Sequence, residues 1–186
     1  MKIIDIQTYG TSLGGNHIYV KVLTDEHIHG TGEAYRVGPD FAVEQTVHYL
    51  KQWLIGEDPT RIEHLWRIMY NGSRFPGGSM LNAAISGIET ALWDLKGKIH
   101  EVPVYQLLGG AAKKTIRLYI GGGSADEVHR AKEQGFTAVK TGPSIAVNGV
   151  IKQPFDMKAE ITRLRQMRDA AGDDFDILYD AHTQFK

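Results

Sequence analysis

The stretch that decides the fold runs from residue 82 to residue 110 and reads NAAISGIETALWDLKGKIHEVPVYQLLGG. Its apolar side chains recur at helical spacing and its alanines allow close packing, which predicts one long helix; these residues are Ile85, Ile88, Leu92 and Leu95, with Ala83, Ala84 and Ala91 beside them. Pro103 then opens a short helix that ends at Gly109-Gly110. The stretch therefore predicts a long, closely packed helix followed by a short one.

Three strands and two further helices are predicted before this stretch. Residues 2–9 alternate, with Ile4, Ile6 and Thr8 on one side, and residues 17–23 and 30–34 continue as strands of an antiparallel meander. Apolar residues between 41 and 54 recur at helical spacing. The next helix begins near residue 60, where Thr60 and Glu63 fit a capping box.

After residue 114 the pattern changes to alternating strands and helices. Strands are expected at 116–120, 136–141 and 176–179, and helices at 124–134 and 156–170. Ser124 with Glu127 fits a second capping box, and Met157, Ile161, Leu164 and Met167 form the expected apolar face of the last helix. This order predicts a parallel sheet. The expected domains are therefore residues 1–112 and 113–186.

Composition narrows the class of protein. A net charge of -1, with no basic stretch, argues against a nucleic-acid partner. The absence of cysteine excludes disulfides and thiolate metal sites. No apolar run approaches the ~20 residues of a membrane span, and the start lacks the apolar stretch of a signal peptide. We therefore expect a cytoplasmic protein with neither a membrane nor a nucleic acid as partner.

Two candidate chemical groups follow the expected strands. Asp180 and His182, two residues apart, would project together from the end of the third strand. A carboxylate is a natural Mg²⁺ ligand, and a histidine can donate a proton near neutral pH. The alternative is that Asp180 caps a following helix and His182 is a surface residue. Lys140, at the end of the second strand, could neutralise a substrate carboxylate, bond a metal ligand or, with a pKa lowered by desolvation, act as a base, or it could simply be solvated.

Residues 82–110, together with the G-x-G-E-A segment at 30–34, closely resemble the cap domain of the mandelate racemase-like branch of the enolase superfamily. The resemblance implies an α+β cap domain followed by a partial (β/α)8 TIM barrel, of which this chain holds the first three strands. It also implies Mg²⁺ bound by three carboxylates. Asp180 stands where the first belongs, and the other two would lie beyond residue 186. Family members remove a proton next to a carboxylate and stabilise the enediolate with the metal.

Two short motifs refine the branch. Racemases of the family usually carry Lys-x-Lys after the second strand, whereas this chain has Lys140-Thr141-Gly142. The Asp180-Ala181-His182 segment resembles galactonate and mannonate dehydratases, although Thr183 replaces their usual glycine. The resemblance implies Mg²⁺-dependent dehydration of an aldonic acid to a 2-keto-3-deoxy acid. His182 would be the general acid, and the base would be a histidine beyond residue 186.

The family chooses its small-molecule sugar-acid substrates partly through cap loops, here residues 11–16 and 35–39. The candidate substrate contacts are Asn16, His17, Tyr35, Arg36 and, in a glycine-rich loop, Arg74. Each of these polar loop residues could instead be merely solvated. The family's habit also implies a homo-oligomer.

Three other readings stay open. The first is a racemase or epimerase, which Gly142 disfavours. The second is a non-catalytic interaction module. The third is a fragment, since a (β/α)8 barrel takes about 250 residues. With one metal ligand and no base, the 186-residue chain alone is expected to be inactive.

Overall fold

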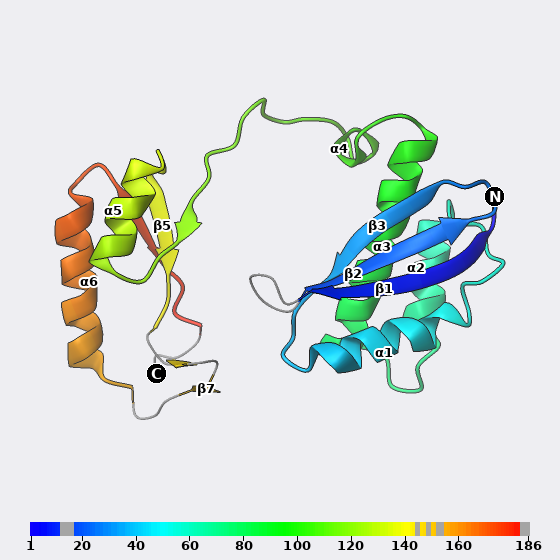
Figure 1. Cartoon of the computed structure of the whole chain (residues 1–186), viewed down its shortest axis with the longest axis horizontal. Helices are drawn as coiled ribbons and strands as arrows, with labels where there is room; N and C mark the ends of the chain where they lie inside the picture. Colours follow the sequence, from blue (N-terminus) through cyan, green and yellow to red (C-terminus); the bar gives the residue numbers. More distant parts are fainter. Residues whose placement is uncertain (12–16, 144–145, 148–149, 152–154, 183–186) are drawn as a thin grey trace. The chain divides into compact units, whose positions relative to one another are not determined.

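The first sheet is an antiparallel meander of three consecutive strands, as the alternation predicted (Figure 1). Its strands are β1 (Ile3–Thr11), β2 (His17–Thr24) and β3 (His29–Ala34). The computed structural model describes residues 1–11, 17–143, 146–147, 150–151 and 155–182. It divides the chain into two compact units, Met1–Ala112 and Lys113–Lys186, and each unit has a hydrophobic core of its own.

Strand β1 departs from simple alternation at its first residues. Ile3 pairs with Thr24 and Asp5 pairs with Leu23, so Ile4 is an extra residue in a bulge. Ile3 and Ile6 are therefore both fully buried, whereas Ile4 is 54% exposed. The prediction that Ile4 and Ile6 share one side is wrong, because the bulge shifts the alternation by one residue.

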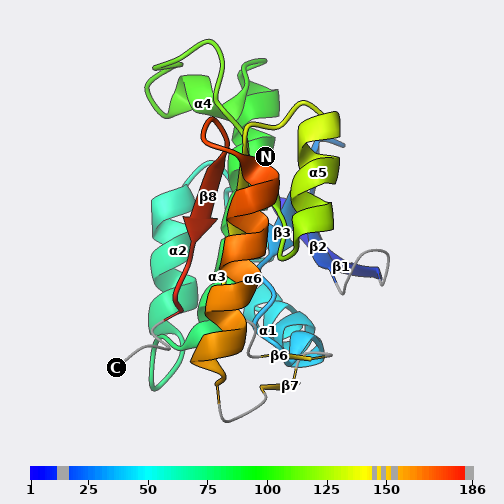
Figure 2. The same ribbon diagram turned by 90° about the vertical axis from the view of Figure 1, so that its left-hand side faces the viewer.

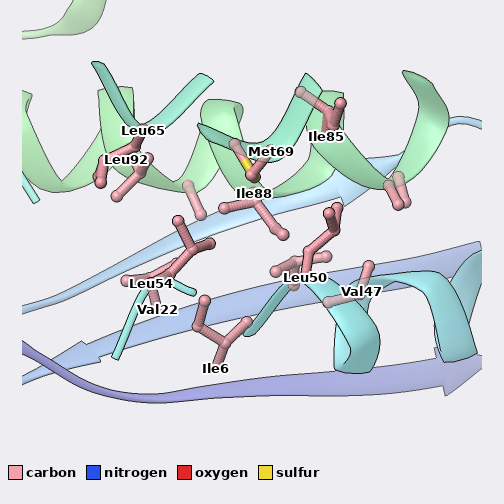
Figure 3. Packing of buried hydrophobic residues seen from close by; sticks show 14 of the residues in the cluster. Ile6, Val22, Val47, Leu50, Leu54, Leu65, Met69, Ile85, Ile88 and Leu92 are labelled. Carbon is pink, nitrogen blue, oxygen red and sulfur yellow. The ribbon is translucent and has the colours of Figure 1, made fainter. Parts of the chain in front are cut away.

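The described residues of the first unit also form four helices: α1 (Asp40–Lys51), α2 (Ile62–Asn71), α3 (Ser79–Ile99) and α4 (Val104–Leu107). The predicted apolar face of α3 is buried throughout, from Ile85 to Leu95. Figure 3 shows how side chains of the sheet and the helices meet in one core. Ile6 and Val22 come from the sheet, Leu50 from α1, and Met69 from α2. Burying such large apolar side chains contributes roughly 1.5–3 kcal/mol each.

Helix α2 begins in a different way from the one predicted. The backbone N–H and the hydroxyl of Thr60 both donate to Asp58 Oδ1, at 2.9 and 2.7 Å. The residue before the helix is Arg61, which makes no side-chain capping bond, and Glu63 pairs with Arg67 instead. The Thr60–Glu63 capping box is therefore wrong, because the helix begins one residue later than predicted and the Thr60 backbone N–H bonds to Asp58 and not to Glu63.

The two glycines of the G-x-G-E-A segment let β3 lie directly on the backbone of α3. A Cβ atom on Gly30 would lie 1.8 Å from the carbonyl oxygen of Ala91, and one on Gly32 would lie 2.2 Å from that of Gly87. Between them, the Thr31 N–H donates to Asp94 Oδ2 at 2.7 Å. The motif therefore has a packing role within the first unit.

The second unit contains a parallel sheet in the order β4-β5-β8, which confirms the predicted strand–helix alternation. Its elements are β4 (Ile120–Gly121), α5 (Ala125–Glu133), β5 (Ala138–Thr141), β6 (Ala146–Val147), β7 (Val150–Ile151), α6 (Met157–Ala171) and β8 (Asp176–Tyr179). Helices α5 and α6 lie side by side (Figure 2). Strands β6 and β7 form a short antiparallel pair that the sequence analysis did not predict.

Helix α5 starts as predicted, because the Glu127 N–H donates to the Ser124 hydroxyl at 3.3 Å. The first strand of this unit is shorter than predicted, since Ile116 and Leu118 lie before β4 and are largely exposed.

Helix α6 confirms its predicted apolar face at Met167 and, partly buried, at Leu164, but not toward its N-terminus. Its buried residues are Glu160, Met167 and Ala171, whereas Met157 and Ile161 are exposed. A carboxylate thus occupies a position for which hydrophobic periodicity would select an apolar side chain.

Candidate functional site

The ends of β5 and β8 bring two predicted site residues together. These strands pair in parallel, with Thr141 opposite Tyr179, so Lys140 and Asp180 both reach the same edge. Lys140 Nζ lies 2.9 Å from Asp180 Oδ2, and both side chains are more than one-third exposed. A salt bridge this exposed contributes little to stability.

His182 joins this pair through a turn and not through a strand. Strand β8 ends at Tyr179, and the N–H of Asp180 donates to the Thr141 carbonyl at 2.9 Å. The His182 N–H donates to Asp180 Oδ1 at 3.1 Å, and His182 itself has φ +47°. Its Nε2 then lies 3.6 Å from Asp180 Oδ2. The expected proximity is present, but the predicted strand geometry is wrong, because the backbone turns at Asp180.

Gly142 leaves the space that this turn occupies. A Cβ atom on Gly142 would lie 2.9 Å from the Asp180 carbonyl oxygen and 3.2 Å from His182 Cδ2. The nearer of these atoms is backbone and cannot simply rotate away. A lysine at residue 142 would therefore have to displace the turn that carries His182.

The charge on Asp180 suits a hard cation. Lys140 lowers the pKa of this carboxyl most, and the N–H of His182 lowers it further. Asp180 is thus ionised at neutral pH and offers oxygen atoms of the kind that Mg²⁺ prefers. In the part of the chain that the structure describes, no three His, Cys, Asp or Glu side chains gather as a metal cluster. Asp180 therefore fits the role of one ligand among several.

Three predicted substrate contacts gather in the first unit. His17, Tyr35 and Arg36 line an open hollow of about 630 Å³, together with Glu33 and Ser86. His17 Nδ1 lies 2.7 Å from Glu33 Oε1, so these side chains orient each other.

The structure describes only one of the other two predicted contacts. Asn16 lies outside the described residues. Arg74 stands 5.4 Å from the ring of Phe75 and does not line the hollow.

Asp40 is a further candidate, which no sequence motif singled out. This residue begins α1 and lines a second hollow, of about 370 Å³, which His17 also borders. Its Oδ1 atom is buried and accepts no hydrogen bond from any described residue. A buried acceptor without a donor is costly, so a ligand hydroxyl would be well placed here. No sequence pattern separates such an aspartate from one that favours a helix N-terminus.

An α+β unit followed by a parallel strand–helix unit, with charged groups at the strand ends, is the arrangement that the resemblance to the enolase superfamily implied. Residues 6–109 match the family model described as mandelate racemase/muconate lactonizing enzyme, N-terminal domain. The chain belongs to this family, and the resemblance inferred from residues 82–110 is confirmed.

Sequence similarity to curated proteins agrees with this family assignment. D-galactonate dehydratases from Cronobacter sakazakii and Pectobacterium atrosepticum are 37% and 38% identical over 98% of this chain. The chain spans about half of each relative, at 48% of its length.

Two solved structures are also similar in fold. An enolase from Agrobacterium radiobacter with bound sodium and L-malate is 36% identical, with a TM-score of 0.83, over 100% of this chain and 49% of its own. An enolase from Pantoea ananatis with bound D-gluconate and magnesium is 30% identical, also with a TM-score of 0.83, over 100% of this chain and 54% of its own. The predicted fold class, a cap domain followed by part of a barrel, is therefore confirmed.

Proposed function

We propose that this chain is the front part of a Mg²⁺-dependent hydro-lyase that converts an aldonic acid into a 2-keto-3-deoxy acid. The observation that carries the proposal is the Asp180–His182 turn, which fits against Gly142 and beside Lys140. The similarity to D-galactonate dehydratases supports the reaction, and the gluconate bound to the Pantoea enzyme supports the substrate class.

Each of the three polar side chains, His182, Asp180 and Lys140, has a role in this proposal. The His182 side chain is 62% exposed, which leaves its imidazole able to reach a substrate and protonate the departing 3-hydroxyl. Asp180 would hold the Mg²⁺ ion, whose charge stabilises negative charge that develops on the substrate. Lys140 holds Asp180 in its ionised form and offers a positive charge to a substrate carboxylate.

Substrate selection in this proposal belongs to the cap. His17, Tyr35 and Arg36 present ring, phenol and guanidinium groups to one hollow, which suits a polyhydroxy acid. Asn16 and Arg74 remain candidate contacts by virtue of their loops.

A racemase or epimerase is the second candidate, and the structure disfavours it. A two-base mechanism needs a second basic group on the Lys140 side, and the space at residue 142 is already used by the turn. The remaining alternative is a non-catalytic interaction module, which the turnover experiment below distinguishes from an enzyme.

The test begins with the coding sequence past Lys186 and the mass of the intact protein. The encoded protein is then incubated with a panel of aldonates and Mg²⁺ in D₂O. The 2-keto-3-deoxy product and the deuterium at C2 of the remaining aldonate are measured in the same sample. We expect His182→Asn to abolish product while C2 exchange persists, because the base is a different residue. The matched control is His129→Asn, which changes an exposed histidine on α5.

Product formation at an unchanged rate in His182→Asn would overturn the role of the imidazole. C2 inversion without loss of water would favour the epimerase. A mass near 21 kDa, that of the 186-residue chain, with no turnover would favour the interaction module.

A further inference from the structure

A buried ion pair on α6 bonds to the backbone beside the candidate site. Glu160 is only 3% exposed, and its carboxylate binds the guanidinium of Arg163, with Arg163 Nε 3.1 Å from Glu160 Oε2. The Tyr179 hydroxyl donates to Glu160 Oε1 at 2.9 Å. Burial and this bond raise the pKa of Tyr179 to about 12, so the phenol keeps the proton that it donates.

The same guanidinium holds two strand ends. Arg163 Nη1 donates to the Gly123 carbonyl at 2.8 Å and to Thr141 Oγ1 at 3.0 Å, and Nη2 donates to the Gly142 carbonyl at 2.8 Å. Gly123 follows β4, and Gly142 follows β5. One side chain thus connects α6 to the chain segments that leave two neighbouring strands.

One of these segments is in direct contact with the candidate site. A Cβ atom on Gly142 would meet the Asp180 carbonyl oxygen and the ring of His182, so Gly142 lies against both. A shift of Gly142 would therefore move or release the His182 turn. Buried ion pairs often add little net stability compared with apolar residues, so their value can lie in defining one geometry.

A second arginine of α6 provides a natural comparison. Arg168 Nη1 donates to the carbonyls of Gly172 and Phe175, at 2.7 and 2.8 Å. Phe175 directly precedes β8, whereas the Arg163 contacts follow β4 and β5. The two arginines make the same kind of bond at opposite ends of the strands.

We propose that Arg163, oriented by Glu160, is a positioning residue that fixes the segments after β4 and β5 and thereby places the His182 imidazole. The importance of that placement rests on the function proposed above, whereas the placement itself can be measured without substrate.

The experiment compares Arg163→Lys with Arg168→Lys in the same chain by amide hydrogen exchange. The site-end reporters are the N–H groups of Gly122 and Asp180, which bond to Lys140 and Thr141 carbonyls; the far-end reporters are those of Phe136 and Asp176. We expect Arg163→Lys to accelerate exchange at the site end by about tenfold, because hydrogen bonds that the charged Arg163 guanidinium makes are lost. Exchange at the far end should stay unchanged. Arg168→Lys should show the reverse.

The imidazole provides a second readout. In proton NMR spectra, the imidazole C–H resonances of His182 are assigned by their absence in His182→Asn. Their chemical shifts should change in Arg163→Lys and stay the same in Arg168→Lys. Equal acceleration at all four amides would overturn the proposal, because Arg163 would then stabilise the whole unit. No acceleration at any of them would also overturn it, because Arg163 would then hold neither segment in place.

If Arg163→Lys does not fold, Tyr179→Phe decides the question, because it removes one bond to Glu160 and keeps the ion pair. A smaller acceleration confined to the site end supports positioning, and a uniform or absent change refutes it. Exchange at the site end responding as expected, in a protein that dehydrates no aldonate, would overturn the proposed function and leave the positioning role intact.

Discussion

The contact between β3 and α3 gives a sharp test of the first unit. Replacing Gly30 with alanine places a Cβ atom 1.8 Å from the Ala91 carbonyl oxygen, where at least about 3 Å is needed. Strand and helix must therefore separate by more than about 1 Å, and the obstacle is backbone and not a flexible side chain. Overpacking typically costs 1–3 kcal/mol, and this geometry belongs at the upper end, at about 3 kcal/mol.

The matched control is Gly10→Ala in β1. A Cβ atom there would have nothing within 4 Å, so the substitution should be neutral or stabilise by about 0.5 kcal/mol. Both variants change glycine to alanine in a strand of the same sheet, and only one meets a helix.

Urea unfolding followed by tryptophan fluorescence measures this difference. All three tryptophans, Trp53, Trp66 and Trp93, lie in the first unit, so the signal reports on that unit alone. A Gly30→Ala variant within about 0.5 kcal/mol of the original, the usual range for a harmless surface change, would refute the close approach of β3 to α3.

Two further predictions use the same fluorescence assay. Leu92→Ala should cost about 2–5 kcal/mol, because Leu92 is fully buried, whereas Leu108→Ala should cost little, because Leu108 is 66% exposed; similar losses would contradict the assigned core. Lys51 lowers the pKa of Asp5 in the folded state, so this pair stabilises the unit above the unfolded pKa of about 3.9, and the stability is lost as pH falls through the folded pKa. Lys51→Met should therefore lower the urea midpoint at neutral pH and converge with the original chain in acid, and a gap that persists in acid would argue against the pairing.

Local patterns predicted most of the elements because the necessary information lies within a few residues. The 3.6-residue period of residues 83–95 identified α3 and its buried face, and Ser124 with Glu127 identified the start of α5. The motif after the third strand identified Asp180 and His182 as candidates, and the end of the second strand identified Lys140; the structure then showed that Lys140 and Asp180 lie together.

Where prediction failed, a partner distant in sequence or a break in local geometry decided the outcome. The bulge at Ile4 reversed the side on which that residue lies, and Asp58 accepts the Thr60 backbone N–H that the capping box assigned to Glu63. Periodicity favoured Ile161 for the buried face of α6, whereas burial of Glu160 depends on the nearby Arg163 and on Tyr179, 19 residues away.

The sequence alone determined the family, the order of most elements and the residue types available for chemistry, because these depend on composition, period and motif. Tertiary structure decided why Gly30 must be glycine, how Gly142 makes room for the His182 turn, and that Arg163 holds Gly123 from 40 residues away. Those features depend on the distance between atoms from separate segments, and such distances exist only once the chain has packed.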